Sequence, residues 1–426
     1  MERFFVEGGN RLQGEVEVSG AKNAALKLIA AALLTPGRTT LRNVPRIKDV
    51  DTILAVLGGL GAKSEFDGNT LSIDPSGVDS YMAPYELVRQ MRASIVVLGP
   101  LVARFGEAEV SAPGGCNLGL RKFNFHLDGL QALGAQVGLD HGFIRAAAPQ
   151  GLFGAEINFD YPSVTATENV MMAAVLACGT TIIENSAREP EVVALADFLN
   201  LMGARIYGAG TGRIVIEGVE ELSPVEYAVM SDRIEAGTFV MAAAATGGDV
   251  LVRDANPDHL KMELAKLKEM GVDWRAVEDG IRIRAGDPEK LGSVDVSTLP
   301  FPGFATDLQA QMMVLLTQTS GVGIITENVY ENRLQVAEEL NRMNAGIDLF
   351  GGHRALVRGP RKLSGTIVQS PDLRGGAALV VAGLVAEGTT IVDGARHILR
   401  GYEDFEEKLT GLGATVALEA ESAVRR

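Results

Sequence analysis

A pattern of apolar positions repeats six times along the chain, at intervals of 68 to 73 residues. The phrase LGGLGAKSEF and five variants of it are anchored on Gly61, Gly134, Gly203, Gly271, Asn344 and Gly413. A second phrase, such as GTTII or GDVLV, precedes each anchor and begins at Gly37, Gly106, Gly179, Gly248, Gly321 and Gly388. Two phrases that stay in step six times indicate an internal repeat.

Each repeat predicts the same series of elements. The GTTIIE-type phrase is rich in β-branched residues and predicts a short strand. A stretch such as EPEVVALADFLNLMG predicts an amphipathic helix closed by glycine. Alternating runs around Asp-Gly, as in KSEFDGNTLSID and DWRAVEDGIRIRA, predict hairpins. A second helix, such as GTFVMAAAA, is apolar on every side and must therefore be buried. We expect an α/β protein with two domains of three repeats around buried helices; a single ring of six is the alternative.

Equivalent positions fourteen residues before the second phrase open the buried helices. These positions are Asn23, Arg92, Thr165, Ile234 (or Arg233 by the neighbouring anchor), Asp307 and Arg374. Helix N-termini carry partial positive charge and unpaired N–H groups, so they can bind anions. Helix capping explains Asn23, Thr165 and Asp307, but it explains Arg92 and Arg374 poorly. With Lys22 nearby, the pattern predicts an anion site.

Composition and charge narrow the function classes. The chain has 426 residues, of which 46% are hydrophobic, so it can bury more than one core. Its 39 basic and 54 acidic residues give a net charge of −15, which makes nucleic acid or an anionic membrane an unfavourable partner. The start of the chain lacks an apolar signal core, and the apolar stretch 169–183 is shorter than the roughly 20 residues that span a bilayer. We expect a cytoplasmic protein.

The two cysteines differ in their surroundings. Cys116 follows Pro113-Gly114-Gly115 and precedes Arg121 and Lys122, which favour a thiolate. Cys178 lies in MMAAVLACGTTI, where core packing is expected. The cysteines and five histidines show no metal-binding spacing, so no metal or cofactor is predicted.

Several longer motifs carry a family resemblance. They are SGAKNAAL, MRAS, GPLVARFG, PGGC, TIIENSAREPE, TDLQAQ, ENR, DLR and HILRGYE. Together they span the chain, which resembles the UDP-N-acetylglucosamine 1-carboxyvinyltransferase (enolpyruvyl transferase) family. The resemblance implies two inside-out α/β barrel domains, each of three βαβαββ repeats, with the active site between them. One domain would comprise residues 22–230, and the other residues 1–21 and 231–426.

The resemblance also implies a reaction. Family members transfer the enolpyruvyl group of phosphoenolpyruvate to the 3-hydroxyl of UDP-N-acetylglucosamine and release phosphate, the first committed step of bacterial peptidoglycan synthesis. Addition followed by elimination needs an acid, a base and cations. By resemblance, Cys116 is the proton donor and the target of fosfomycin, and Asp307 is the base. The implied catalytic residues are Cys116, Asp307, Lys22, Arg121 and Arg400.

The same motifs imply two sets of binding residues. Those for phosphoenolpyruvate are Lys22, Asn23, Arg121, Arg374 and Arg400. Those for the nucleotide sugar are Arg92, Arg121, Lys122, Phe123, Asn124, Phe125, Tyr161, Ser163, Val164, Thr165, Asp307 and Val329. These small molecules are the expected partners.

Three of these positions depart from the family pattern. Asn124 stands where an aspartate is common, Thr165 replaces a glycine beside the diphosphate, and Tyr161 brings no cation. The Thr165 side chain could crowd a phosphate or its hydroxyl could bond to it. A paralogue with an altered acceptor is therefore one alternative. Shikimate-3-phosphate enolpyruvyl transfer is another, although that family carries Ser-Lys-Ser where this chain has Ala21-Lys22-Asn23. Loss of Cys116, Asp307 or an arginine would suggest a non-catalytic binder, and none is lost.

Overall fold

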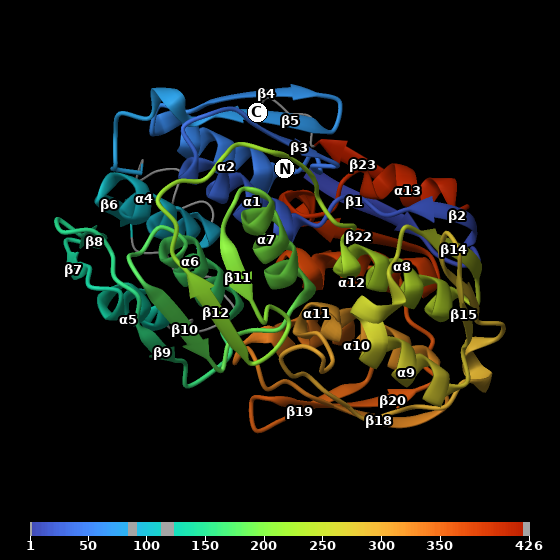
Figure 1. Ribbon diagram of the computed structural model, residues 1–426. Coiled ribbons are helices and arrows are strands. Elements are labelled where there is room, and N and C mark those ends of the chain that lie inside the picture. Colours follow the sequence, from blue (N-terminus) through green and yellow to red (C-terminus); the bar gives the residue numbers. More distant parts are fainter. Residues whose placement is uncertain (1, 84–91, 112–122, 421–426) are drawn as a thin grey trace. The chain divides into compact units, whose positions relative to one another are not determined.

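The computed structural model describes residues 2–83, 92–111 and 123–420 (Figure 1). These residues divide into two compact units. Unit 1 contains residues 2–19 and 231–420, and unit 2 contains residues 20–83, 92–111 and 123–230. The chain therefore begins in unit 1, passes into unit 2 after Ser19 and returns after Met230.

Unit 2 contains three small sheets in its described part. Their strands, in hydrogen-bonded order, are β13 (Glu226–Ala228), β3 (Thr39–Arg42), β5 (Thr70–Asp74), β4 (Lys63–Asp67); β6 (Glu107–Ser111), β8 (Phe143–Ala147), β7 (Gln136–Asp140); and β11 (Arg205–Tyr207), β12 (Arg213–Glu217), β10 (Thr180–Glu184), β9 (Glu156–Asn158). In each sheet an antiparallel hairpin joins the strand formed by the GTTII-type phrase.

Unit 1 repeats this arrangement. Its sheets are β15 (Asp273–Val277), β16 (Gly280–Arg284), β14 (Asp249–Arg253), β2 (Gln13–Glu17); β17 (Val296–Ser297), β18 (Gly321–Thr326), β20 (Arg354–Gly359), β19 (Ile347–Phe350); and β21 (Ile367–Gln369), β22 (Thr389–Asp393), β1 (Glu2–Glu7), β23 (Thr415–Ala420). In the last sheet, β1 takes the place that β20 has in its own sheet, so the N-terminal strand completes the sixth repeat. One sheet per repeat confirms the predicted sixfold pattern.

The helices of each unit follow the two predicted kinds. Those of unit 2 are α1 (Lys22–Ala31), α2 (Lys48–Gly59), α4 (Leu98–Phe105), α5 (Asn124–Ala132), α6 (Val164–Ala174) and α7 (Pro190–Leu201), and those of unit 1 are α8 (Arg233–Thr246), α9 (Lys261–Met270), α10 (Gln309–Gln318), α11 (Val336–Arg342), α12 (Leu373–Val385) and α13 (Phe405–Gly411). All of α8 except Arg233, and all of α10 except Gln318, is buried. Such helices bury their whole surface because they have no polar face to expose.

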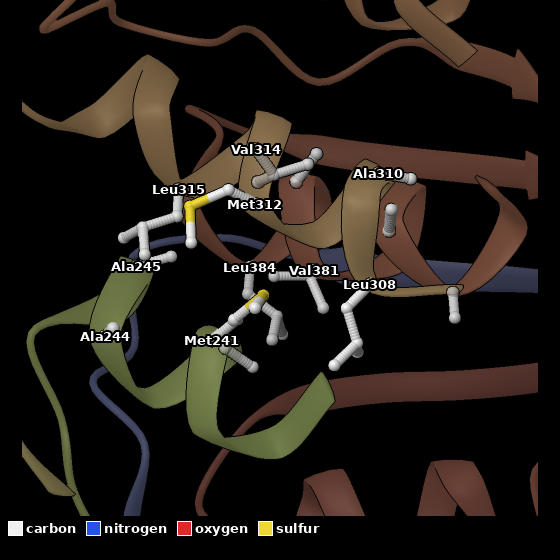
Figure 2. Close-up of a cluster of buried hydrophobic side chains, with 14 of the residues drawn as sticks. Met241, Ala244, Ala245, Leu308, Ala310, Met312, Val314, Leu315, Val381 and Leu384 are labelled. Carbon is white, nitrogen blue, oxygen red and sulfur yellow. The ribbon is translucent and has the colours of Figure 1, made fainter. Parts of the chain in front are cut away.

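The core of unit 1 forms where α8, α10 and α12 meet. Figure 2 shows Met241 of α8, Leu315 of α10 and Leu384 of α12 turned toward one another. All three side chains are at most 1% exposed. Small residues, including Ala244 and Ala245 of α8, let the helices approach closely. This packing fixes the N-terminal ends of the helices, where the candidate residues lie.

The predicted hairpins form, but the glycines of the two Asp-Gly pairs play different roles. In β4–β5, Asp67 pairs with Thr70, and Gly68 occupies the turn with φ of 57°. In β15–β16, Val277 pairs with Gly280, which is therefore the first residue of the strand. A side chain at Gly280 would place its Cβ 2.1 Å from the carbonyl oxygen of Val252. Glycine is needed there because β14 passes so closely.

One prediction about the core is wrong. Cys178 lies beyond the end of α6 and is exposed, so it does not pack in the core. The apolar run that contains it ends as the helix ends, and Gly179, at φ of 100°, leads into β10. Among the described residues, no helix combines the length and the apolar character that a membrane span requires.

Candidate functional site

The six equivalent positions all lie at the beginning of a helix, as the repeat predicts. Asn23 is the second residue of α1, Thr165 the second of α6, Ile234 the second of α8 (which begins at Arg233), and Arg374 the second of α12. Arg92 is the first residue of a 3₁₀ helix (Arg92–Val97), and Asp307 is the second of a 3₁₀ helix (Thr306–Leu308) before α10. The three equivalent helix starts of unit 2 therefore carry candidate residues, and in unit 1 two of the three do, at Asp307 and Arg374.

Helix capping does not explain these residues. No side chain caps α1, α6 or α10, so the capping interpretation of Asn23, Thr165 and Asp307 is wrong. The caps are found instead on the arginine-bearing helices. Asp232 accepts hydrogen bonds from the first turn of α8, and Asp372 accepts them from Arg374 and Gly375 of α12. These aspartates precede the arginines, and short carboxylates are favoured at this position.

In unit 1 the Asp307 carboxylate lies between two buried arginines. Its Oδ1 is 2.7 Å from Nη2 of Arg333, and its Oδ2 is 3.3 Å from Nε of Arg374. The side chains of Arg333 and Arg374 are 4% and 3% exposed, whereas that of Asp307 is 25% exposed. The Asp307 side chain is therefore partly accessible to solvent, whereas the side chains of both arginines are buried.

The arginines determine the charge of Asp307. Burial alone raises the pKa of this carboxyl, but Arg333 and Arg374 outweigh burial and hold the pKa well below its usual range. Burial lowers the pKa of Arg374, while Tyr402 and Asp307 raise it, with a net upward shift. All three groups are therefore charged at neutral pH.

A buried polar cluster holds Arg374 in place. Its guanidinium carbon lies 5.3 Å from the centre of the Tyr402 ring. The hydroxyl oxygens of Tyr402 and Thr238 are 2.9 Å apart, and Gln311 donates to both hydroxyls. Because α8, α10 and the segment before α13 (Phe405–Gly411) each contribute one of these groups, Arg374 has little freedom to move.

Glu327 organises the segment around Val329. Its Oε1 accepts hydrogen bonds from the backbone of Val329 at 2.8 Å and Tyr330 at 3.0 Å. Its Oε2 accepts from the Thr306 hydroxyl at 2.9 Å, and Arg333 donates to that same hydroxyl at 3.1 Å. The predicted nucleotide-sugar residue Val329 is thus linked by hydrogen bonds to the neighbour of Asp307.

The other predicted residue of unit 1 is Arg400. It is the last residue of a 3₁₀ helix (Ala395–Arg400) and is partly buried. Together with Arg396, its charge lowers the pKa of His397, to which burial contributes most. The positive charge around this helix is thus strong enough to affect a neighbouring side chain.

In unit 2 the predicted cation Lys22 already has a carboxylate partner. Its Nζ lies 2.8 Å from Oδ2 of Asp49 in α2, and both side chains are largely buried. The backbone carbonyl oxygen of the neighbouring Asn23 accepts a hydrogen bond from Nζ of Lys27 at 2.7 Å. The start of α1 therefore places a lysine beside first-turn N–H groups, as an anion site requires.

A second ion pair in unit 2 was not predicted from the sequence. Lys27 of α1 lies 3.2 Å from Glu168 of α6, and the two side chains are 5% and 0% exposed. Burial, as the largest influence, raises the pKa of Glu168 to about 7, although Lys27 opposes it. The sequence did contain a signal for this pair, since Lys27 lies five residues after Lys22 inside an apolar helix. A buried cation needs an oppositely charged or hydrogen-bonding partner.

The nucleotide-sugar candidates within residues 123–125 and 161–165 of unit 2 lie at or just before two helix starts. Phe123 precedes α5 and Asn124 begins it, exposed to solvent. Phe125 packs edge-on against Phe159, with ring centres 5.8 Å apart. Tyr161 is 38% exposed. Ser163 is the N-cap residue of α6, and Val164 and Thr165 follow it.

Some predicted residues cannot be placed. Cys116, Arg121 and Lys122 lie outside the described residues, and for Arg92 only the backbone is described. Within residues 2–83, 92–111 and 123–420, no group of three or more histidine, cysteine, aspartate or glutamate side chains could hold a metal ion. Arg333 belongs to the ENR motif at 331–333, so the motif indicated it although no role was assigned.

Known proteins resemble this chain along almost its whole length. The family described as EPSP synthase (3-phosphoshikimate 1-carboxyvinyltransferase) matches residues 6–409. Two relatives are named UDP-N-acetylglucosamine 1-carboxyvinyltransferase. The one from Desulfosudis oleivorans is 54% identical and the one from Trichlorobacter lovleyi 49%, each over 98% of this chain and 99% of the relative.

Solved structures agree on the fold. The enolpyruvyl transferase NikO from Streptomyces tendae superposes with a TM-score of 0.87 at 27% identity, covering 98% of both chains. EPSP synthase from Acinetobacter baumannii gives a TM-score of 0.77 at 20% identity, covering 99% of this chain and 100% of that chain. The predicted enolpyruvyl transferase fold is therefore confirmed. With relatives of about 50% identity over almost its full length, this chain belongs to the UDP-N-acetylglucosamine 1-carboxyvinyltransferase family.

Proposed function

We propose that this protein transfers the enolpyruvyl group of phosphoenolpyruvate to the 3-hydroxyl of UDP-N-acetylglucosamine and releases phosphate. The observation that carries the proposal is the 54% identity, over 98% of the chain, to a relative named for this reaction. The arrangement of Asp307 with Arg333 and Arg374 supports the proposal. The reaction needs a carboxylate and cationic groups, and an arginine keeps its positive charge at any physiological pH.

Asp307 is the proposed base for the sugar hydroxyl. In the unliganded protein two arginines hold its pKa low, which makes it a weak proton acceptor. Arg374 is also a proposed ligand of phosphoenolpyruvate, whose phosphate and carboxylate are anionic. When that anion binds, it neutralises part of the guanidinium charge, and the pKa of Asp307 rises toward the range a general base needs. Substrate binding would thereby prepare the base.

The other half of the chemistry needs a proton donor and residues that bind the anionic groups of phosphoenolpyruvate. Cys116 donates the proton to C3 of the enol, and the neighbouring Arg121 and Lys122 adjust its thiol pKa. Lys22, Asn23, Arg121, Arg374 and Arg400 bind the phosphate and carboxylate of phosphoenolpyruvate. Guanidinium groups suit both anions because each can donate two parallel hydrogen bonds.

The nucleotide sugar is proposed to contact residues at several helix starts and in the segment around Val329. The residues are Arg92, Arg121, Lys122, Phe123, Asn124, Phe125, Tyr161, Ser163, Val164, Thr165, Asp307 and Val329. At Val329 the N–H group already donates to Glu327, so the backbone contact would use the carbonyl oxygen. Asn124 retains a carbonyl acceptor for uracil but lacks the carboxylate charge that is common at this position.

The wider role follows from the reaction. We propose a part in peptidoglycan synthesis, and hence in cell wall biogenesis, cell shape and division, carried out in the cytoplasm without a cofactor. Alkylation of Cys116 by fosfomycin is a further expectation. A second candidate function, transfer to an altered nucleotide sugar, is motivated by Asn124, which is exposed at the start of α5.

A phosphate-release assay with phosphoenolpyruvate and UDP-N-acetylglucosamine tests the proposal. The wild type should turn over, and Cys116→Ala should lose about 10²-fold or more, as expected for removal of a general acid. Cys178→Ala is the matched control, since Cys178 is exposed and has no assigned role, and it should keep full activity. Turnover only with another acceptor would overturn the substrate assignment, and full activity of Cys116→Ala would overturn the role of Cys116.

A further inference from the structure

A directional chain of hydrogen bonds leads from the interior of unit 2 to Thr165. The backbone N–H of Gly99 in α4 donates to Oδ1 of Asn169 at 2.8 Å. Nδ2 of Asn169 is 3.0 Å from Nδ1 of His126, and Nε2 of His126 is 3.3 Å from the Thr165 hydroxyl oxygen. The mechanism proposed above uses neither His126 nor Asn169.

The chemistry of the groups fixes the direction of this chain. The Gly99 N–H can only donate, so the Asn169 side-chain atom that it contacts must be the amide oxygen. The amide nitrogen of Asn169 must therefore face His126. That nitrogen is a donor, so Nδ1 of His126 accepts and Nε2 carries the proton. The histidine therefore donates to Thr165, whose oxygen is occupied as an acceptor. The Thr165 hydroxyl hydrogen must then point to another acceptor.

Packing keeps the chain in this arrangement. Asn169 is fully buried, and His126 is 4% exposed. A Cβ at residue 99 would lie 2.7 Å from Oδ1 of Asn169, so only glycine lets α4 approach α6 this closely. Among the described residues, His126 is the one hydrogen-bond partner of the Thr165 side chain. The series of hydrogen bonds that starts at Gly99 thus ends with the hydroxyl hydrogen of Thr165, at the start of α6.

We propose that Thr165 donates this hydrogen to a phosphoryl oxygen of the nucleotide sugar, and that His126 is a positioning residue that sets its direction. This inference rests on the proposed function, which assigns Ser163, Val164 and Thr165 to the nucleotide sugar, and on the family resemblance, which implies that the diphosphate lies beside Thr165. The acceptor would be an anionic oxygen next to the first-turn N–H groups of α6, which no side chain caps. Thr165 would then add a contact that a glycine at this position cannot make.

The first test measures binding of UDP-N-acetylglucosamine by calorimetry. Thr165→Val removes the hydroxyl at nearly constant shape and should weaken binding roughly tenfold, the usual effect of losing a hydrogen bond to a charged group. Thr165→Ser should bind within about threefold of the wild type, since it keeps the donor. The affinity for UDP, which lacks the sugar, should fall by the same factor in Thr165→Val.

Kinetics separate this role from a structural one. The KM for the nucleotide sugar should rise in Thr165→Val and His126→Leu, with kcat and the KM for phosphoenolpyruvate unchanged. The double variant should be no worse than either single one, because both act on one contact. Thr180→Val, at an exposed threonine that begins β10, is the matched control and should leave all constants unchanged.

Different failures point to different conclusions. If Thr165→Val binds within twofold of a wild type that turns over normally, the inference is wrong and the proposed function stands. If Thr165→Gly binds tighter than the wild type, the side chain crowds the phosphate, which also overturns the inference. Additive losses in the double variant would overturn the role of His126. A wild type that neither binds nor converts UDP-N-acetylglucosamine would overturn both proposals. If His126→Leu does not fold, the Thr165 variants still decide.

Discussion

Two ion-paired carboxylates, one in each unit, have opposite titration behaviour; the side chain of Asp307 is 25% exposed and that of Glu168 is 0% exposed. Asp307 in unit 1 lies between Arg333 and Arg374, which hold its pKa well below the usual range although burial opposes them. Glu168 in unit 2 has Lys27 as its ion-pair partner, and burial raises its pKa to about 7. Two rigid guanidinium groups thus overcome the cost of burial, whereas one lysine does not.

The difference does not belong to the units themselves. Glu235 of α8, also in unit 1, accepts from Lys408 at 2.6 Å and from the Ser19 backbone at 3.1 Å. Burial raises its pKa to about 7 as well, despite that lysine. The number and kind of the cationic partners, together with the depth of burial, therefore decide whether an ion-paired carboxylate stays charged, and the two arginines lie at the proposed base.

Replacing Asp307 with asparagine should have the largest effect on stability. Asp307→Asn leaves two buried guanidinium groups without their shared carboxylate, which costs about 3 kcal/mol. In the wild type this stabilisation is fully present above the unfolded-state pKa of about 3.9 and is lost only as pH falls through the lower folded-state pKa. The stability difference, measured by urea unfolding, should therefore be constant from pH 5 to pH 9.

An exposed aspartate provides the control for this variant. Asp273 pairs with Arg275 at 3.6 Å, and both side chains are more than half exposed. Asp273→Asn should change stability by less than about 0.5 kcal/mol. A difference between Asp307→Asn and the wild type that grows as pH falls from 7 to 5 would show that the folded-state pKa of Asp307 is raised and not lowered.

Removing Lys27 should instead give a destabilisation that depends on pH. In the wild type, the raised pKa of Glu168 means that its contribution to stability is full below the unfolded-state pKa of about 4.3 and declines as pH rises toward 7. Lys27→Met raises that pKa further, so the decline continues above pH 7. We expect little change at pH 5 and a loss of about 2 kcal/mol at pH 8, measured by urea unfolding.

The double variant Lys27→Met/Glu168→Gln serves as the control. It removes the carboxylate together with its partner and should recover most of the loss at pH 8, because no buried charge remains unpaired. A loss that is equal at pH 5 and pH 8 would contradict the raised pKa of Glu168.

An exposed pair in unit 2 should have the smallest effect. Arg205 and Glu217 are 3.8 Å apart, with side chains 64% and 47% exposed. Arg205→Ala should change the free energy of unfolding by less than about 0.5 kcal/mol at every pH, as measured by urea unfolding. A cost above 1 kcal/mol would show that ion-pair number matters even without burial.

Much of the fold was predictable because the repeat encodes it. The two phrases marked the strands and helices, and the helices without a polar face were recognisable as buried. The six equivalent helix starts, including those at Asp307 and Arg374, followed from spacing alone. Where sequence reasoning failed, local context was the cause. Gly280 proved to be a close-approach glycine, and Cys178 lies just beyond the end of its helix.

The partners of the site residues could not be predicted in the same way. Arg333 and Asp307 are 26 residues apart in the chain, and Lys27 and Glu168 are 141 apart. Such pairs depend on packing between elements of different repeats, which periodicity does not encode. The sequence therefore showed charged residues at equivalent helix starts but not the ion pairs of Asp307 with Arg333 and Arg374. The hydrogen-bond chain from Gly99 to Thr165 could not be predicted from the sequence at all.

Carboxyl titration by nuclear magnetic resonance tests the central claim most directly. In protein with ¹³C at the aspartate and glutamate side-chain carboxyls, Asp307→Asn and Glu168→Gln each remove one signal and so identify it. The Glu168 signal should titrate with a midpoint near 7, and the Asp307 signal should not move between pH 4 and pH 9. An Asp307 midpoint inside that range, or a Glu168 carboxyl still charged at pH 5, would contradict the account.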